Sequence, residues 1–296
     1  MKNVVLFHNP GAGDGEHSSD SLMSTIRREG YECHHQAVVD DEWDDELLQQ
    51  ADLFAIAGGD GSVRAVMKHL CENDHLLQIP IAVLPMGTSN NIARSLVIHD
   101  EMEIRIASWR TSIRLPFNIS SVHYGKKHDW MIEGVGAGLF PDHIKYMIEN
   151  PTSDSTAEER QRSGLLELIK NMEQQQAYEC ELELDGRPHS GKYLMVEIMN
   201  NRFVGPTLEL APDAITNDGW LNVVLVAEKD RDRLRNYLRT RLDDGEERVY
   251  FTSIRVKKIR LKCESACYHL DDELLEIASK AVVDVGSGAK KGIFLV

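Results

Sequence analysis

The sequence predicts an α/β domain with a parallel sheet, followed by a second domain that is mainly antiparallel β. In the first 110 residues, short apolar runs alternate with segments of helical periodicity, as in parallel strands joined by crossover helices. From about Arg110 onward, β-period runs separated by turn residues take over. A chain of 296 residues is also long for one hydrophobic core. We therefore expect domains at residues 1–110 and 111–296, with Ile293–Val296 returning as a strand to either of them.

Composition and charge limit the kinds of function that we expect for this protein. The chain is 42% hydrophobic and 27% charged, as in a soluble globular protein, and no apolar run approaches the ~20 residues that span a bilayer. Its N-terminus lacks the features of a secretory signal, so we expect a cytoplasmic protein. A net charge of −15 argues against nucleic acid as a partner and against non-specific attraction to anionic lipid. Any contact with a membrane must therefore be local.

The cysteines predict no disulfide framework. They are odd in number and scattered along the chain, which fits a reducing compartment. The five positions are Cys33, Cys71, Cys180, Cys263 and Cys267.

The elements of the first domain follow from apolar periodicity and from capping residues. Strands are expected at 4–8, 31–39, 53–57 and 79–84. The first helix begins at the Ser18-Ser19-Asp20 caps and ends at Gly30. A second helix follows Gly61, and a short third helix is expected at 89–96.

Three glycine turns each follow a strand and precede a helix, at 9–15, 58–61 and 85–88. Glycine lets a ligand approach the main chain, and the first amides of a helix carry the positive end of its dipole. One such turn is equally well explained as a plain connection between a strand and a helix. Three turns on the carboxyl edge of one parallel sheet favour a polyphosphate site. Oxygen or amide side chains accompany these turns at Asn9, Asp60, Ser62, Thr88 and Asn90.

The second domain is predicted to be built from short strands. Asp185-Gly186 is a strong hairpin signal. Residues 141–156 read as irregular, and 157–176 as a helix whose apolar stripe suits either core packing or a lipid-facing role. The expected strands are 112–120, 129–135, 179–184, 189–199, 220–226, 248–256, 258–263, 267–270, 274–277 and 281–285.

An ordered set of motifs resembles the diacylglycerol kinase catalytic-domain family, which includes bacterial lipid kinases and the sphingosine and ceramide kinases and is related to NAD kinases. The resemblance covers nearly the whole chain. The motifs are Asn9-Pro10-x-x-Gly13, Gly58-Gly59-Asp60-Gly61-Ser62, Pro85-x-Gly87-Thr88-x-Asn90, Gly134-x-Gly136, Asn200 with Gly205, Ala211-Pro212-x-Ala214, Asp218-Gly219-x-Leu221 and Asp271-x-Glu273.

The resemblance implies a nucleotide-binding α/β domain of the NAD kinase-like type, a C-terminal β-sandwich and an active site in the cleft between them. It also implies transfer of the ATP γ-phosphoryl group to a lipid hydroxyl with Mg²⁺. The residue chemistry agrees independently, because phosphoryl transfer needs amides for phosphates, a metal to offset charge and a carboxylate to deprotonate an alcohol.

The resemblance also assigns roles to single residues. Asp60 is expected to hold magnesium water, and Asp218 to hold a structural cation with main-chain oxygens of Ile215 and Trp220. An ordinary Asp-Gly turn is the alternative for Asp218. The residues expected at the nucleotide are Asn9, Gly13, Gly58, Gly59, Asp60, Gly61, Ser62, Thr88 and Asn90.

Asp271 matches the general base of the family, with Glu273 as a supporting carboxylate. Two acids two residues apart on a strand point to the same side, so we expect them to share one site. A solvated β-turn is the alternative interpretation. Three departures from the family bear on activity, because Asn91 and Asn118 stand where aspartates are usual and Asp272 stands where glycine is usual.

Two hypotheses follow. The first is an ATP- and Mg²⁺-dependent lipid kinase that acts on a diacylglycerol-like or other long-chain lipid at the membrane surface. The second is a nucleotide-binding regulatory protein with weak or no turnover, because two amides in place of anions should weaken metal binding. An NAD kinase-like enzyme with a soluble substrate fits the second-domain motifs less well. The sequence identifies neither the lipid nor the oligomeric state, and a homodimer is compatible with it.

Overall fold

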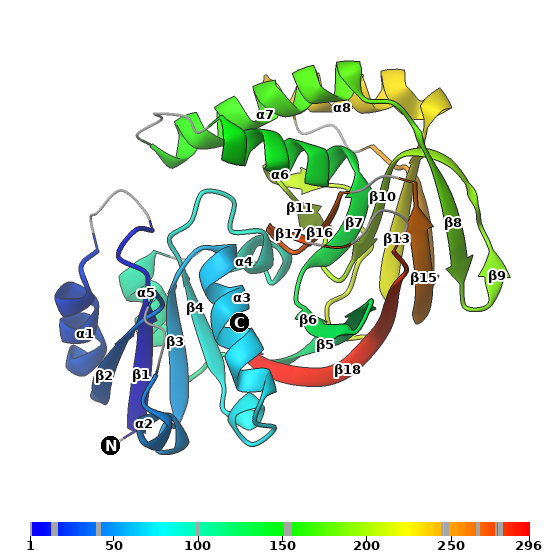
Figure 1. Cartoon of the computed structure of the whole chain (residues 1–296). Coiled ribbons are helices and arrows are strands. Elements are labelled where there is room, and N and C mark those ends of the chain that lie inside the picture. Colours follow the sequence, from blue (N-terminus) through cyan, green and yellow to red (C-terminus); the bar gives the residue numbers. More distant parts are fainter. Residues whose placement is uncertain are drawn as a thin grey trace. The chain divides into compact units, whose positions relative to one another are not determined.

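The computed structural model describes residues 2–12, 17–39, 43–98, 101–150, 156–243, 245, 249–264, 267–275, 277 and 281–296. The chain forms two compact units, which we call unit 1 (Met1–Phe117 with Lys290–Val296) and unit 2 (Asn118–Ala289). It passes from one unit to the other twice, within β5 (Arg114–Tyr124) and within β18 (Val283–Leu295). The final residues of β18 therefore belong to unit 1, far in sequence from its other elements (Figure 1).

Unit 1 contains a parallel sheet in the order β18–β4–β3–β1–β2. Its register pairs Val4 with Leu53 and Phe54 with Ile81, and Ile81 also pairs with Phe294 of β18. Because β1, β3 and β4 are adjacent and parallel, their carboxyl ends lie at one edge. The strands are β1 (Lys2–His8), β2 (Tyr31–Ala37), β3 (Leu53–Gly58) and β4 (Ile81–Pro85).

Helices cover both faces of this sheet because its strands are apolar on both sides. Leu22 and Ile26 of α1 pack with Leu6 and Ala55 on one face, whereas Phe7 contacts Trp43 on the other, with ring centroids 4.7 Å apart. The helices are α1 (Ser19–Arg28), α2 (Asp45–Gln49), α3 (Asp60–Cys71), the 3₁₀ turn η1 (Leu76–Gln78), α4 (Asn91–Ser95) and α5 (Met102–Ser108).

Unit 2 is built on antiparallel strands in the order β17–β16–β7–β10–β8–β15–β18, with β13 pairing both β10 and β14 and β5 pairing β6. Alternate residues of β10 enter two different cores. Val196 and Ile198 pack among other strands, while Met195 and Met199 pack under the helices. The strands not yet bounded are β6 (Lys127–Met131), β7 (Gly134–Gly138), β8 (Tyr178–Leu184), β9 (Arg187–Pro188), β10 (Gly191–Met199), β11 (Phe203–Val204), β12 (Leu208–Glu209), β13 (Leu221–Ala227), β14 (Thr252–Val256), β15 (Lys258–Cys263), β16 (Tyr268–Leu270) and β17 (Glu273–Leu275).

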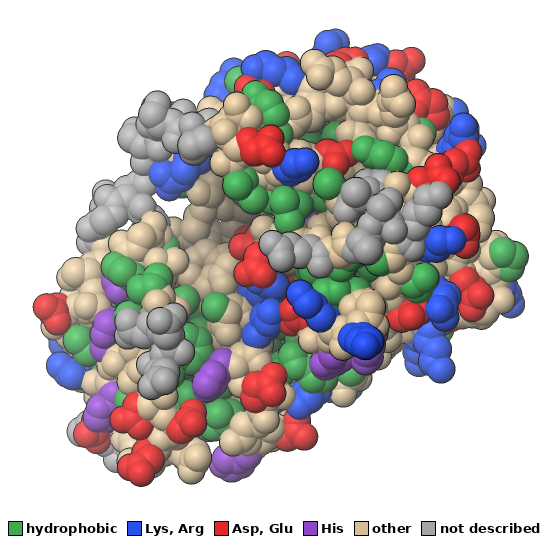
Figure 2. Space-filling model, viewed as in Figure 1, with side chains coloured by type: hydrophobic (Ala, Val, Ile, Leu, Met, Phe, Trp, Pro, Cys, Tyr) green, Lys and Arg blue, Asp and Glu red, His purple; other side chains and the backbone are tan. Residues whose placement is uncertain are grey.

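Three helices, α6 (Leu139–Glu149), α7 (Ala157–Gln174) and α8 (Arg231–Leu242), lie over one core of unit 2, with the 3₁₀ turn η2 (Glu228–Asp230) preceding α8. The apolar stripe of α7 packs in this core through Leu165, Leu168 and Met172, whereas Leu166 is exposed. On the face shown in Figure 2, basic and acidic side chains are interspersed over α7 and α8. Arg231 pairs with Glu228 and Arg235 with Glu173, so these arginines are neutralised locally.

The predicted fold class is confirmed, but several boundaries differ. Residues 129–135 form two strands rather than one, because the chain bends at Ile132–Glu133 between β6 and β7. Residues 141–149, expected to be irregular, continue helix α6, in which Pro141 is tolerated because it lies in the first turn. The segments expected as strands at 281–285 and 293–296 are one strand, β18.

Helices α5 and α8 were not predicted. Arginine-rich α8 has a narrow apolar stripe, since only Leu234, Tyr237 and Leu238 of its residues are buried. Within the described residues, no helix is long and apolar enough to cross a membrane.

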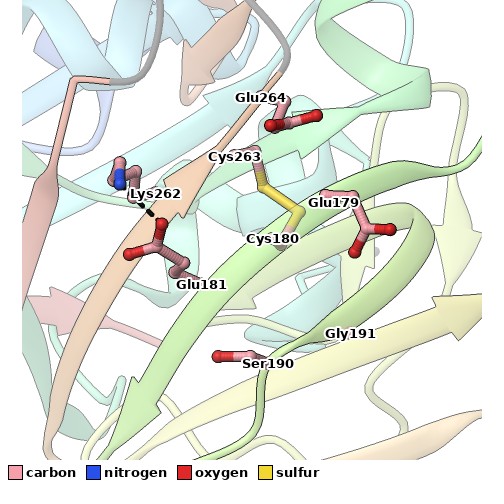
Figure 3. Close-up of a pocket in the computed structure, with 8 residues that line it drawn as sticks. All are labelled: Glu179, Cys180, Glu181, Ser190, Gly191, Lys262, Cys263 and Glu264. Atoms are coloured by element: carbon pink, nitrogen blue, oxygen red, sulfur yellow. Dashed lines mark hydrogen bonds and ion pairs between the residues drawn. A yellow bond between two sulfur atoms is a disulfide. The ribbon is translucent and has the colours of Figure 1, made fainter.

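The cysteines form no framework of several disulfides among the described residues, but one pair is bonded, which the sequence did not predict. Cys180 and Cys263 are directly paired residues of β8 and β15, with Cα atoms 4.1 Å apart, and their sulfurs are bonded. Strand register brings them together across 83 residues of sequence, which spacing alone does not reveal. A cavity of about 170 Å³ lies beside the bond (Figure 3). Its lining consists of Glu179, Cys180, Glu181, Ser190, Gly191, Lys262, Cys263 and Glu264, none of which is a predicted site residue.

Candidate functional site

The three glycine turns of unit 1 contact one another at the carboxyl ends of β1, β3 and β4. Asn9, after β1, donates from Nδ2 to Ser62 Oγ of α3 at 3.2 Å. The turn after β4 donates from Met86 N to Gly58 O at 2.9 Å. Asn9 Oδ1 also accepts from Gly11 N at 2.9 Å, which shapes its own turn. The predicted convergence is therefore present within unit 1, except for Gly13, which lies outside the described residues.

Glycine is required at two of these turns by close packing. A Cβ on Gly58 would lie 2.3 Å from Ser62 Oγ. A Cβ on Gly87 would lie 2.4 Å from the Cα of Gly59, so the second and third turns touch backbone to backbone. This contact aligns the amides at the start of α3 with the turn before α4. Gly61 lies in the first turn of α3, and Thr88 lies in the loop between β4 and α4.

Asn90 shapes the third turn. It occupies the left-handed region at φ 51°, which asparagine tolerates better than most residues. Its side chain accepts from Gly87 N and donates to Gly87 O, both at 2.8 Å. Its position is thus fixed by the turn itself.

Asp60 holds the start of α4. One carboxylate oxygen accepts from Asn91 N at 2.8 Å and the other from Ile92 N at 3.0 Å. This is an N-terminal capping interaction supplied from a different helix, and a carboxylate suits the positive end of a helix dipole. Carboxylate oxygens have further lone pairs, so magnesium water could share Asp60 with these amides. Asn91, one of the departures from the family, presents its backbone amide to Asp60 and is buried.

Asp271 forms the turn of the β16–β17 hairpin. Its φ is +54° and its side chain is buried, with the residue 7% exposed. The carboxylate accepts from Glu133 N at 2.8 Å, Gly134 N at 3.0 Å and, at 3.2 and 3.3 Å, Ile132 N. Its own N–H donates to Gly134 O at 2.6 Å. Asp271 therefore stabilises the bend between β6 and β7. The sequence pattern did not predict this bend.

The expectation that Asp271 and Glu273 share one strand face is wrong. Leu270 pairs with Glu273, so Asp271 and Asp272 form a two-residue loop, and strand alternation does not apply across it. Glu273 is exposed, whereas Asp271 is buried. The solvated-turn alternative is also wrong for Asp271, because its carboxylate is sequestered. Asp272 does not take a positive φ, so the position does not demand glycine.

Asp218 is engaged by neighbouring residues. One oxygen accepts from Trp220 N at 2.9 Å, and the other accepts from the Arg255 guanidinium. Arg255 and Lys257 also lie over the Trp220 ring, so the site already carries cationic groups. Ile215 is 52% exposed. Asn118, oriented with Oδ1 toward the turn, accepts from Gly219 N at 2.7 Å and Asp218 N at 3.2 Å.

The fit of a metal ion differs between these positions. Among the residues that the structure describes, no three His, Cys, Asp or Glu side chains gather as a metal cluster. At Asp218 a cation would have to displace Arg255, so a structural metal does not fit there as the side chains lie. At Asp60 one carboxylate lies beside the turns, which suits Mg²⁺ because this ion keeps several waters and takes phosphate oxygens as ligands.

Sequence reasoning missed two ionisable residues beside the Asp271 turn. Glu197 of β10 and His269 of β16 are buried, with Oε2 and Nε2 2.8 Å apart. His269 Nδ1 lies 2.8 Å from the carbonyl oxygen of Asp271. An acid inside the apolar run Leu194–Met199 was the available signal, since such a residue is seldom buried without a partner.

Comparison with known proteins agrees with this architecture. The family model described as "Diacylglycerol kinase catalytic domain" matches residues 3–122, and the model "YegS C-terminal NAD kinase beta sandwich-like domain" matches residues 147–283. A "Diacylglycerol kinase" of Bacillus subtilis is 26% identical over 235 residues, covering 76% of this chain and 74% of that protein. A "Probable lipid kinase YegS-like" of Pectobacterium atrosepticum is 24% identical over 237 residues, with the same coverage.

The fold is shared with solved structures. A crystal structure of a diacylglycerol kinase from Bacillus anthracis superimposes with a TM-score of 0.68 at 16% identity, covering 99% of this chain and 96% of that chain. Fold and matches together define a kinase, that is, a phosphotransferase with two domains. The chain thus combines a domain of the diacylglycerol kinase catalytic type with a C-terminal domain of the YegS type, and the two relatives are named as a diacylglycerol kinase and a probable lipid kinase.

Proposed function

We propose that this protein is an ATP- and Mg²⁺-dependent lipid kinase that phosphorylates a hydroxyl of a diacylglycerol-like or other long-chain lipid at the membrane surface. The observation that carries the proposal is the coincidence of two features in a family of lipid kinases. One is the set of three contacting glycine turns in unit 1. The other is the sequestered Asp271 carboxylate in unit 2.

Unit 1 supplies the nucleotide site in this proposal. The turns after β1, β3 and β4 present backbone amides and the start of α3 to the phosphates. Mg²⁺, when bound, offsets the negative charge that moves with the γ-phosphoryl group. Asp60 is the carboxylate that would hold its water, and Asn9, Ser62, Thr88 and Asn90 fix the surrounding turns or face the nucleotide.

Unit 2 supplies the base. Asp271 takes the proton of the lipid hydroxyl while that oxygen forms its bond to the γ-phosphorus. The bond between the γ-phosphorus and the bridging oxygen breaks, and ADP leaves. The three backbone amides hold the carboxylate in one orientation, which is the positioning that phosphoryl transfer needs.

The test is an assay of the purified protein with radiolabelled ATP, Mg²⁺ and lipids presented in mixed micelles. We expect a labelled phospholipid from the wild type and none from the Asp271→Asn variant. Asp185→Asn is the matched control, because Asp185 also lies in a two-residue hairpin loop and accepts backbone amides, at Lys257 and Lys258. Turnover unchanged in Asp271→Asn would remove the assigned base, and no product from the wild type with any lipid would remove the proposed function.

A second candidate is a nucleotide-binding regulatory protein with little or no turnover. It is favoured by the amides at Asn91 and Asn118 and by the use of both Asp60 oxygens to cap α4. Titration calorimetry distinguishes the two candidates. Tight ATP binding without transfer to any lipid supports the regulatory protein, whereas transfer supports the kinase.

We further propose that the protein acts in the cytoplasm as a peripheral membrane protein. The net charge of −15 opposes general attraction to anionic lipid, so contact would be local and dependent on the substrate. Flotation with neutral vesicles that contain diacylglycerol, compared with vesicles that lack it, tests this expectation. Equal flotation with both would contradict it.

A further inference from the structure

A buried ion pair, Glu197 and His269, adjoins the turn that carries the proposed base, Asp271. Glu197 and His269 are 0% and 1% exposed, with Oε2 and Nε2 2.8 Å apart. They share the face of Met195 and Met199, and the Phe140 ring of α6 packs edge-on against His269 at 6.3 Å. Burying two charges in such surroundings often costs as much free energy as the pair returns, so its presence is poorly explained by stability alone.

The pair meets across a glycine. Glu197 of β10 and His269 of β16 are both register partners of Gly136 on the strand between them, β7. A Cβ on Gly136 would lie 2.3 Å from Glu197 Oε1. The absent side chain at Gly136 is therefore what allows the carboxylate to reach the imidazole. This accounts for the second glycine of the Gly134-x-Gly136 motif in this chain.

Both nitrogens of the His269 ring face acceptors. Nε2 faces the Glu197 carboxylate and Nδ1 faces the Asp271 carbonyl oxygen at 2.8 Å. A neutral imidazole has only one N–H, so this geometry suits the doubly protonated ring. Burial lowers the pKa of His269, but the Glu197 carboxylate and the Asp271 carbonyl outweigh burial and raise it above the ordinary histidine value. The charge of the Asp271 carboxylate also raises this pKa, whereas Phe140, which packs against the ring, is uncharged.

We propose that Glu197 and His269 act as a positioning pair that holds Asp271 in the orientation needed to accept the substrate proton. The pair donates one hydrogen bond to the main chain of Asp271, while the amides of Ile132–Gly134 hold its side chain. This inference rests on the proposed kinase function. Neither Glu197 nor His269 touches the reacting atoms, so neither is a catalytic residue.

The first experiment compares His269→Gln with the wild type. Losing the charged donor frees the Asp271 turn to move, so we expect kcat to fall by about 100-fold while KM for ATP stays within about twofold. His143→Gln is the matched control, because His143 is also buried in unit 2 but bonds Asn171 rather than Asp271. Equal kcat in His269→Gln and the wild type would overturn the proposal.

The second experiment uses Glu197→Gln, which keeps the shape of the side chain. Without the carboxylate, burial lowers the pKa of His269, so the ring should keep its proton only at more acidic pH than in the wild type. We expect the kcat of Glu197→Gln to approach that of the wild type toward acidic pH and to fall as pH rises. A purely structural role would lower stability without this pH dependence. A kcat of Glu197→Gln that equals the wild-type value at every pH contradicts the proposal. This experiment also tests the proposal if His269→Gln does not fold.

A third measurement separates failure of this inference from failure of the proposed function. In wild-type protein with ¹⁵N-labelled histidine, NMR should find both ring nitrogens of His269 protonated at pH 6.5, where an ordinary histidine is only half protonated. A neutral His269 ring at that pH overturns the inference even if the enzyme is active. A doubly protonated ring in a protein that phosphorylates no lipid refutes the proposed function and, with it, the positioning role.

Discussion

Two hairpins of unit 2 each carry an aspartate at the first position of a two-residue loop. Asp185 and Asp271 each take the first position of a two-residue loop, at φ 48° and 54°, and each carboxylate accepts backbone amides. Asp185 is followed by Gly186 at φ 78°, the usual companion in such loops, and both are exposed. Asp271 is buried and followed by Asp272. Both loops thus use an aspartate that accepts backbone amides, whereas they differ in the conformation of the second residue and in the burial of the carboxylate.

The supports behind the two hairpins also differ. β8, which leads into the Asp185 loop, is joined to β15 by the Cys180–Cys263 disulfide. β16, which leads into the Asp271 loop, is joined to β10 by the Glu197–His269 pair across β7. One support is covalent and the other is ionic, so the two hairpins should respond to different perturbations.

The largest effect is expected from truncating the two aspartates. Asp271→Ala leaves three amides at a buried bend without their acceptor, which should lower the free energy of unfolding by about 5 kcal/mol. Asp185→Ala exposes its amides to water, so its cost should stay near 1 kcal/mol. Urea unfolding of both variants measures the difference. Equal losses would mean that burial does not distinguish the hairpins.

The second-largest loss of stability is expected when the disulfide is removed. A bond across 83 residues restricts the unfolded chain, and replacing both Cys180 and Cys263 by serine should cost about 4 kcal/mol. Kinase turnover of the double variant should match that of the wild type, because the bond joins β8 to β15, whereas the Asp271 carboxylate is held by the amides of residues 132–134. Thermal unfolding and the lipid assay check both statements, and lost turnover in a folded double variant would break the comparison.

Two buried histidines of unit 2 should give opposite pH dependences. Burial lowers the pKa of His143 to about 4, and Asn171 donates to its Nδ1, which fits a neutral ring. The unfolded chain takes up a proton near 6.5, so stability should fall by about 3 kcal/mol as pH drops from 6.5 toward 4.

The pKa of His269 is raised, so its contribution is present below 6.5 and is lost as pH rises through the folded value. Unfolding of His143→Gln between pH 4 and 6.5 isolates the first effect. An unchanged slope in this variant would rule out a neutral His143.

A smaller effect is expected at Asp60. Asn in this position keeps one acceptor oxygen and turns an amino group toward the other amide at the start of α4. Asp60→Asn should therefore lower the unfolding free energy by about 1 to 2 kcal/mol. Weaker ATP binding in calorimetry is expected in addition, because the turns that contact one another would loosen. A stability equal to that of the wild type would show that Asp60 does not cap α4.

The smallest effect is a gain in stability. Helix α4 ends in a Schellman arrangement, in which Ile98 N bonds Ala93 O and Val97 N bonds Arg94 O. Val97 holds the left-handed position at φ 59° and is 65% exposed, although glycine is the usual residue there. Val97→Gly should raise the unfolding free energy by about 1 kcal/mol. A lower melting temperature in this variant would contradict that reading of the helix end.

Local patterns were enough to predict the architecture. Apolar runs and caps located the strands of unit 1 and its helices α1, α3 and α4, and the order of its glycine turns predicted that they would meet, because parallel strands end at one edge. Asp185-Gly186 gave its hairpin directly. These features depend on residues close together in sequence, and such local patterns can be recognised in one sequence alone.

The rest depends on partners that are distant in sequence. The Cys180–Cys263 bond follows from strand register, and the bend after β6 follows from a carboxylate more than a hundred residues away at Asp271. Glu197 and His269 meet only because Gly136 lies between them. The resemblance singled out Asp271, but its burial, its positive φ and its three amide donors required the fold.

The path of β18 bears on how the protein is made. Its last residues complete the unit 1 sheet by pairing with β4, whereas its first residues pair with β15 of unit 2. During synthesis the edge of β4 therefore stays open until the ribosome has produced all of unit 2. An open strand edge is a template for misassembly. Unit 1 should accordingly need a chaperone, or rapid release of the finished chain, before its three glycine turns become stable.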